Sequence, residues 1–242
     1  MFLDLFSVKK PIIGMLHLIG DTPAEKIKEC LKEAAIYKKC SVDAMLLEDY
    51  FGSREDVVAC MKALSQEDDY LYGANVLDNF SFTYEMTSMY GGKFMQVDSV
   101  CGHLPVYLDV PYAEMIAAYR KAGTLPIIGG VRFKYQPVLS GRSIEEDMRL
   151  GLQRCDAMAC TGEGTGLETS TGKIAEFRKL IGDFPLVIAA GMTADTVKEK
   201  LSIADAAIVG SYFKEGHKDI GHVKEAHVCE FMDRVFQLRE EC

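Results

Sequence analysis

The sequence carries no excess of positive charge. It has 27 lysine and arginine residues against 36 aspartate and glutamate residues, which gives a formal net charge of −9 at pH 7. Proteins that bind a nucleic-acid backbone normally present a basic face, so we expect no nucleic-acid partner. A small anion is not excluded, because a local nest of backbone N–H groups can hold a phosphate inside an acidic protein.

Neither the pattern of an export signal nor a long apolar run is recognisable in the sequence. The apolar start, MFLDLFSVKKPIIGMLHL, has no basic stretch before it and no small-residue cleavage site after it, so we expect no signal peptide. No run approaches the roughly 18 apolar residues that span a bilayer, so we expect no membrane span.

No Cys-x-x-Cys pair occurs among the eight cysteines, which are scattered over helix-like and strand-like segments. This scatter is typical of reduced, mostly structural thiols in a cytoplasmic protein rather than of a disulfide framework. The cysteines are Cys30, Cys40, Cys60, Cys101, Cys155, Cys160, Cys229 and Cys242.

No Pro/Ser-rich linker, charge block or low-complexity tract interrupts the 242 residues, of which 48% are hydrophobic. One α/β barrel takes about 250 residues, so the length fits one barrel with little insertion, or else two small domains. We predict a single domain over residues 1–242.

Strand-like and helix-like segments alternate from end to end. Several strand-like runs are almost continuously apolar, as expected for parallel strands buried on both faces. The strand-like runs cover residues 11–18, 42–48, 70–77, 93–100, 125–133, 156–161, 185–192 and 204–210. The intervening helices include residues 53–64, 82–90, 112–122, 194–201 and 222–239, and capping boxes at Thr22 and Ser143 open two more.

Eight strand–helix units in chain order close naturally into a barrel. A doubly wound open sheet is the alternative, but it usually keeps a Gly-x-Gly-x-x-Gly fingerprint after its first strand. Here that turn reads HLIGDT. The predicted fold class is therefore α/β, a (β/α)8 TIM barrel of eight parallel strands with outer helices.

In such barrels the active site lies at the C-terminal ends of the strands, so polar residues there are candidate catalytic groups. The carboxylates could be general bases, metal ligands, or partners of the two basic residues in a structural ion network. Lys134 could bind an anion or act as a Schiff-base nucleophile, and His17 could be a satisfied rim histidine. The candidates are His17, Glu48, Asp49, Asp98, Arg132 and Lys134.

The last two strand-like runs each end in glycine followed closely by a hydroxylated residue. PLVIAAGMT closes on Gly191, and ADAAIVGSYFK closes on Gly210 and Ser211. The usual phosphate site of a barrel follows strands 7 and 8, where bare N–H groups meet the ligand. We predict a phosphate there, with Lys214 either paired to it or solvated in the final loop.

Three further residues at the strand ends are predicted to bind the ligand: Asn75, Thr161 and Gly162. The last of these opens a glycine-rich loop over residues 162–172. This loop could be a mobile lid, a second anion cradle or a flexible connection.

Metal and nucleophile motifs are missing. His217, His222 and His227 are five residues apart, which does not place them on one helix face, and no His-Glu-x-x-His or Cys–His set occurs. We predict no metal motif and no certain cofactor, although Mg²⁺ held by the acidic rim would leave no motif. There is no Gly-x-Ser-x-Gly elbow, and a catalytic thiol at Cys160 has no support.

Taken together, the segments KKPIIGMLHL, VDAMLLEDYFG and GANVLDN resemble the BtpA family. The chain departs from the family pattern at Asp49, Asp98 and Tyr135, where an amide, an asparagine and often a histidine are usual, so it resembles a divergent member. The matching positions are Glu48, Asn75, Asn79, Lys134, Thr161, Gly162, Thr165, Gly166, Gly191, Gly210 and Ser211.

The resemblance implies a phosphate-binding barrel. The family is named for a role in photosystem I accumulation in cyanobacteria, but relatives also occur in organisms without photosynthesis. Relatives are often named phosphoribosylanthranilate isomerases. Those enzymes resemble one another in a Lys-Ile-Cys-Gly first strand, whereas this chain has Ile-Gly-Met-Leu-His, which argues against that activity.

The leading hypothesis is an enzyme for a small phosphorylated metabolite, a sugar or nucleoside phosphate, by isomerase, lyase or phosphoribosyl-type chemistry. Glu48 or Asp98 would move a proton, and Lys134 or Arg132 would stabilise developing negative charge. The alternative is a non-catalytic assembly or biogenesis factor on the same scaffold. We also expect a homo-oligomer, although no residue identifies the interface.

Overall fold

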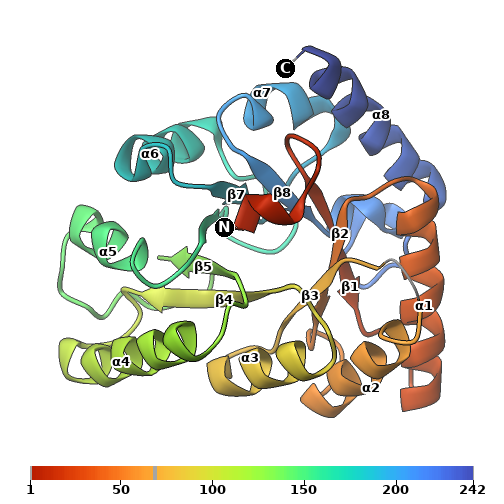
Figure 1. Ribbon diagram of the computed structural model, residues 1–242. Coiled ribbons are helices and arrows are strands. Elements are labelled where there is room, and N and C mark those ends of the chain that lie inside the picture. Colours follow the sequence, from red (N-terminus) through yellow and green to blue (C-terminus); the bar gives the residue numbers. More distant parts are fainter. Residues whose placement is uncertain (1, 68–69, 242) are drawn as a thin grey trace.

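The strands are short and their side chains are buried. In chain order they are β1 (Ile12–His17), β2 (Ala44–Glu48), β3 (Tyr72–Asn75), β4 (Phe94–Cys101), β5 (Ile127–Val131), β6 (Ala157–Cys160), β7 (Leu186–Ile188) and β8 (Ala206–Val209). The computed structural model describes residues 2–67 and 70–241, and in it each strand pairs in parallel with the next until β8 pairs with β1 (Figure 1). The predicted (β/α)8 barrel is confirmed.

The helices surround this barrel. They are α1 (Pro23–Lys39), α2 (Arg54–Leu64), α3 (Phe80–Met89), α4 (Val106–Ala122), α5 (Ile144–Gly151), α6 (Thr171–Ile181), α7 (Val197–Leu201) and α8 (Glu225–Glu241). The Thr22 capping box is present. At Ser143 one half of the predicted box is found, because the Ser143 side chain accepts a hydrogen bond from the Glu146 N–H. Within the described residues, no helix is long and apolar enough to cross a membrane.

Several helix boundaries differ from the prediction, among them the starts of α3, α4, α7 and α8. Helix α4 begins at Val106 rather than at residue 112, and it includes Pro111. Its first turns are fixed by tertiary contacts, because the Asp109 carboxylate binds Arg154 and Arg142. Helix α8 begins at Glu225 rather than at residue 222, because Val223 forms an antiparallel bridge with Lys214.

Two hydrophobic layers hold the barrel. One lies between the strands and the outer helices, and the other fills the barrel interior. The interior layer includes Ile13, Leu46, Phe94 and Ile208, and Phe2 from the N-terminal 3₁₀ turn packs into it with no exposed surface. This turn, red in Figure 1, lies across one end of the barrel. The opposite end of the barrel therefore remains open.

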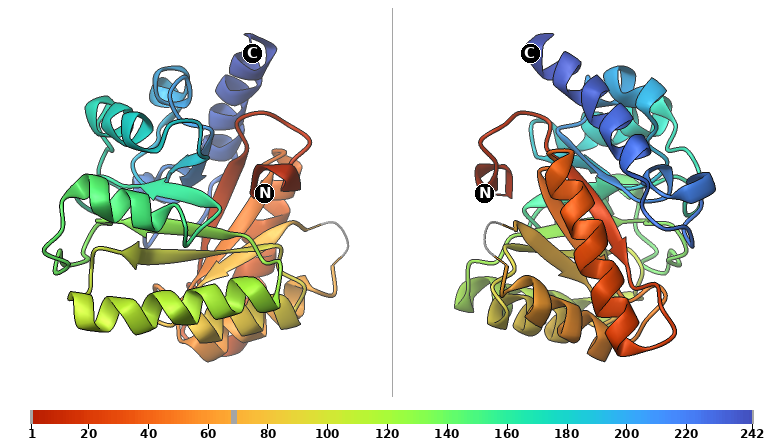
Figure 2. Two further views of the ribbon diagram at one scale, coloured as in Figure 1. Left: turned by 60° about the vertical axis from the view of Figure 1, so that its left-hand side comes forward. Right: turned by 90° about the vertical axis from the view of Figure 1, so that its right-hand side faces the viewer.

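The first and last helices meet where the barrel closes. Helices α1 and α8 lie side by side in Figures 1 and 2, and Cys40 at the end of α1 forms a disulfide with Cys229 in α8. The expectation of reduced thiols is therefore wrong for this pair, which chain folding brings together across 189 residues of sequence. Cys30, Cys60, Cys101, Cys155 and Cys160 are free and buried, and Cys242 lies outside the described residues.

Opening this disulfide is expected to lower the free energy of unfolding by about 2–4 kcal/mol, because the link restricts the unfolded chain over a long loop. Urea denaturation of the wild type should shift to a lower midpoint when dithiothreitol is added. A Cys40→Ala/Cys229→Ala variant provides the control, since its midpoint should not respond to the reductant. Identical wild-type midpoints with and without reductant would contradict the prediction.

Candidate active site

A cavity of about 340 Å³ opens at the C-terminal ends of the strands. The last residues of β1 and β2, His17 and Glu48, line it, together with Asp98 from the part of β4 where the strand pairing is irregular. The turns after β7 and β8 contribute Gly191 and Gly210. The barrel thus brings together polar groups that lie far apart in the sequence, as the (β/α)8 prediction requires.

The predicted site residues divide into those that line this cavity and those that do not. Asn75 lies behind the lining and contacts two of its carboxylates. Asp49, Arg132, Thr161 and Gly162 do not line the cavity. The lining includes His17, Glu48, Asp98, Lys134, Gly191, Gly210 and Ser211.

Glu48 and Asp98 are joined through one amide. Asn75 Nδ2 donates hydrogen bonds to Glu48 Oε1 at 2.9 Å and to Asp98 Oδ1 at 3.0 Å. Burial raises the pKa of Glu48 to about 7, and the charge of Asp98 adds to the shift. Burial also raises the pKa of Asp98. A carboxyl group with a pKa near neutrality can both donate and accept a proton at a pH close to 7.

His17 is held as a neutral base beside Glu48. Its Nδ1 lies 3.0 Å from the Asp219 carbonyl, which can only accept, so Nδ1 carries the proton and Nε2 is free as an acceptor. Nε2 lies 3.7 Å from Glu48 Oε2. Burial and the charge of Lys214 lower the pKa of His17 to about 3, so at neutral pH the two groups do not form an ion pair.

Lys214 supports this arrangement through the same carbonyl. Its side chain has no exposed surface, and Nζ donates a hydrogen bond to the Asp219 carbonyl at 2.8 Å. The alternative of a solvated lysine is therefore wrong. Burial lowers the pKa of Lys214 to about 8, against the charge of Glu33, which raises it.

Lys134 reaches the cavity from a bent segment after β5. Tyr135 has a positive φ of 63°, and the Lys134 N–H donates to Thr161 Oγ1 at 3.0 Å, so the predicted ligand-binding Thr161 anchors this segment instead of lining the cavity. Lys134 Nζ contacts Thr165 Oγ1 at 3.3 Å, and the Thr165 N–H donates to the Tyr135 hydroxyl at 2.8 Å. The glycine-rich loop is thereby docked onto the segment that carries Lys134.

The same loop covers the turn after β7. Gly191 has a φ of 65°, and a Cβ atom there would lie 2.2 Å from the Leu167 carbonyl oxygen. Lys200, which has no exposed surface, pairs with Glu168 at 2.8 Å and donates to the Gly191 carbonyl at 3.4 Å. Only glycine fits this close approach, so here packing explains the residue independently of any ligand.

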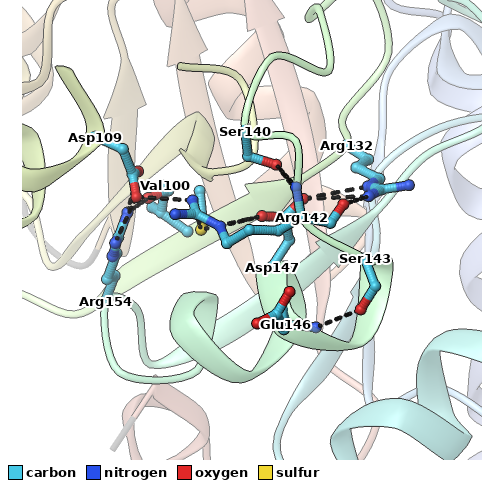
Figure 3. Close-up of polar contacts among 10 residues, drawn as sticks. Val100, Asp109, Arg132, Ser140, Arg142, Ser143, Glu146, Asp147 and Arg154 are labelled. Carbon is cyan, nitrogen blue, oxygen red and sulfur yellow. Dashed lines mark hydrogen bonds and ion pairs between the residues drawn. The ribbon is translucent and has the colours of Figure 1, made fainter. Parts of the chain in front are cut away.

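Arg132 belongs to a separate buried network (Figure 3). It donates to Asp147 at 3.3 Å and to the Arg142 carbonyl at 3.0 Å. Arg142 lies between Asp147 and Asp109, and Arg154 completes the chain by binding Asp109 at 2.6 Å. Arg132 is therefore paired in a structural ion network, but its carboxylate partner is Asp147 rather than the predicted Glu48 or Asp49.

Asp49 and Gly162 also have local structural partners. Asp49 Oδ1 accepts a hydrogen bond from the Leu77 N–H at 3.0 Å, which ties β2 to the loop after β3. A Cβ atom at Gly162 would lie 2.7 Å from the Glu168 carbonyl oxygen, so this glycine allows the loop to fold back on itself.

Sequence reasoning does not single out Tyr50 or Gln96, which also line the cavity. Gln96 Nε2 donates to Asp98 Oδ1 at 3.2 Å, and the Tyr50 ring stacks on His17 with ring centroids 5.2 Å apart. Gln96 could have been found, because residues two apart on a strand share a face. Tyr50 lies beyond the end of β2, where no periodicity applies.

The sequence model described as the BtpA family matches residues 8–237. A protein of Pyrococcus abyssi described as uncharacterized is 25% identical over 266 residues, covering 99% of this chain and 100% of the relative. An uncharacterized protein of Methanocaldococcus jannaschii is 24% identical and covers 87% of this chain and 89% of its own.

Solved structures share the fold at low identity. A phosphoribosyl anthranilate isomerase from Thermus thermophilus is 15% identical with a TM-score of 0.63, covering 95% of this chain and 100% of its own. A structure described as native KDPGal is 13% identical with a TM-score of 0.65, covering 97% and 98%. At this identity the likeness shows the barrel fold alone.

Proposed function

The chain belongs to the BtpA family, and we propose that it is an enzyme that converts a small phosphorylated metabolite at the mouth of its barrel. One observation carries the proposal: a single cavity is lined both by Glu48, whose pKa is raised to about 7, and by the two glycine turns that follow β7 and β8. A proton carrier and an anion cradle within one cavity are what such a reaction needs.

The phosphate would lie at the β7 and β8 turns. Among the described residues, the N–H groups of Gly191, Gly210 and Ser211 donate no loop hydrogen bond to the backbone, so they are available to a ligand. The Lys134 ammonium lines the same cavity and adds positive charge. Backbone N–H groups at such turns bind phosphate well even in a chain with net charge −9.

The chemistry would be proton transfer next to the bound phosphate. Glu48 would take a proton from the substrate or return it, and the unprotonated Nε2 of His17, 3.7 Å away, would accept a hydrogen bond from the protonated carboxyl. Lys134 would stabilise the negative charge that develops on the substrate. This assignment favours isomerisation or carbon–carbon lyase chemistry, on a sugar or nucleoside phosphate.

Two glycine variants test the phosphate site separately from the packing. Gly210→Ala is expected to weaken phosphate binding at least about tenfold, because the added Cβ would lie beside the N–H groups proposed to hold the anion. Its cost in stability should be smaller than at Gly191, because its φ is −115° and the new Cβ would meet only the Met15 side chain, at 3.3 Å, which has to shift slightly. Gly191→Ala should also lower the free energy of unfolding, by about 1–3 kcal/mol, because its positive φ and its contact with Leu167 do not accommodate a side chain.

Titration calorimetry with inorganic phosphate and a panel of sugar and nucleoside phosphates measures the first effect, and urea unfolding of the same preparations measures the second. If none of these compounds binds the wild type or raises its melting temperature, the proposed function is overturned. If Gly210→Ala binds phosphate as tightly as the wild type, the anion lies elsewhere.

An exposed apolar surface favours a second candidate function, a non-catalytic assembly factor. Val106, Tyr107 and Val110 at the start of α4 are more than half exposed. Leu139 is also more than half exposed, and its N–H donates to the carbonyl of Gly102, four residues before α4. A Glu48→Gln/Asp98→Asn/Lys134→Met triple variant distinguishes the candidates. An assembly factor would keep its role in cells, whereas an enzyme would lose it.

A further inference from the structure

Outside the cavity, three ligand-type side chains converge between α1 and the segment before α8. Glu29 and Glu33 are one turn apart on α1, and His222 comes from the segment before α8. One ligand atom from each of the three lies within 4.8 Å of the others. We propose that Glu29, Glu33 and His222 bind a divalent transition-metal ion, with Zn²⁺ as the best-fitting ion, and that this ion links α1 to the segment that leads into α8.

Glu33 is the strongest reason to place an ion here. It has no exposed surface, and its Oε1 accepts a hydrogen bond from the Val223 N–H at 3.0 Å. Its Oε2 is buried without a hydrogen-bond partner among the described residues. A buried oxygen of this kind costs stability unless something satisfies it, and a metal ion would do so.

The backbone positions His222 beside the two carboxylates. Its carbonyl accepts a hydrogen bond from the Glu215 N–H at 2.8 Å, and the next residue, Val223, bridges to Lys214. The His222 ring therefore projects from a fixed strand-like segment, and its Nδ1 lies 2.8 Å from Glu29 Oε1. The His222 side chain is half exposed, which leaves an approach for the ion and for a water ligand.

The donor set selects among metals. One imidazole and two carboxylates suit Zn²⁺ and, less well, Mn²⁺, whereas Mg²⁺ and Ca²⁺ prefer sites made of oxygen alone. Zinc bonds to nitrogen and oxygen are roughly 2.0–2.2 Å long, so ligand atoms on one ion lie within about 4 Å of each other. Small side-chain rotations would bring this group into range. The exposed Lys32, which pairs with Glu29 at 2.9 Å, would compete with the ion.

The ion would therefore be a second link between the first and last parts of the chain, where the barrel closes. The Cys40–Cys229 disulfide already links α1 to α8, and β1 pairs with β8. The proposed ion would link α1 to the segment just before α8, close to the same closure of the barrel. It would also fix the segment that carries Asp219, whose carbonyl accepts from His17. The proposal stands independently of the proposed function, because none of the three ligands lines the cavity.

The test is titration of metal-free, disulfide-intact protein with Zn²⁺, Mn²⁺ and Mg²⁺. Calorimetry measures the affinity for each ion, and thermal unfolding measures the change in melting temperature. We expect one Zn²⁺ per chain, a rise of roughly 5–10 °C in melting temperature at about 100 times the dissociation constant, and weaker binding of Mn²⁺. Co²⁺ substitution should give the visible absorption bands of a nitrogen- and oxygen-ligated ion. No measurement here needs a substrate.

Three variants make the result specific. His222→Ala and Glu33→Gln should each weaken Zn²⁺ binding at least about tenfold. The glutamine oxygen can still accept from the Val223 N–H, so Glu33→Gln should fold even if His222→Ala is impaired. Lys32→Ala, the matched control, should bind at least as tightly as the wild type. Unchanged affinity in His222→Ala, no wild-type binding, or equal affinity for Mg²⁺ and Zn²⁺ would each overturn the proposal.

Discussion

Replacing Glu48 by glutamine is expected to lower turnover about 10³-fold and, at pH 8, to make the protein more stable. The loss of turnover follows from removing the proposed proton carrier, a role that contributes roughly 10²–10⁴-fold in enzymes. Glutamine keeps the shape of the side chain, and its oxygen can still accept the hydrogen bond from Asn75 Nδ2. Turnover would be measured on whichever phosphorylated compound the binding screen identifies.

The gain in stability follows from the raised pKa of Glu48. Burial raises this pKa from 4.5 to about 7, so between these values the folded chain holds a proton that the unfolded chain has released. The stability contributed by the protonated carboxyl is complete below about pH 4.5 and is lost as the pH rises through 7. The loss amounts to about 3 kcal/mol, and glutamine, which does not ionise, avoids it.

Melting curves of both proteins from pH 4.5 to pH 8 test this directly. The melting temperature of Glu48→Gln should exceed that of the wild type at pH 8, and the difference should shrink toward pH 4.5. Asp49→Asn serves as the neighbouring carboxylate control for turnover, because Asp49 binds the Leu77 N–H and does not line the cavity. A difference in melting temperature that does not change with pH would contradict the assignment of the pKa.

Replacing Asp147 by alanine is expected to lower the free energy of unfolding by about 3–5 kcal/mol. Asp147 has no exposed surface and accepts from Arg132, from Arg142 Nε at 2.9 Å and from Ser140 Oγ at 3.0 Å (Figure 3). Its removal leaves charged guanidinium groups partly buried without their partner, which costs more than the pair contributes when intact.

Urea denaturation measures this cost, and an exposed ion pair supplies the control. Lys198 and Glu241 pair at 2.6 Å with side chains 73% and 54% exposed, so Glu241→Ala should cost no more than about 0.5 kcal/mol. Equal midpoints for Asp147→Ala and Glu241→Ala would show that the network contributes little. Because Arg132 precedes Lys134 by two residues, Asp147→Ala should also weaken phosphate binding.

The parts of the fold that were predicted correctly depend on local signals. Apolar runs bounded by glycine and proline mark the strands, and the Thr22 side chain begins α1 through contacts within four residues. The predicted helix boundaries are wrong where contacts with residues distant in the sequence override local helix propensity. Helix α4 extends over Pro111 because Asp109 pairs with Arg154, 45 residues away in the sequence. Local propensity contains no information about such a partner.

The sequence by itself determined the barrel, its strand order and the set of polar residues at the strand ends. The reason is that strands and helices repeat their apolar residues every two or 3.6 positions, a local pattern that needs no long-range contact to be recognised. Only the tertiary structure decided their individual positions. It placed Glu48 and Asp98 on one amide, turned Arg132 toward Asp147, buried Lys214, and joined Cys40 to Cys229. The physical reason is the same in each case: direction and burial of a side chain are set by neighbours from distant segments, which meet only when the barrel closes.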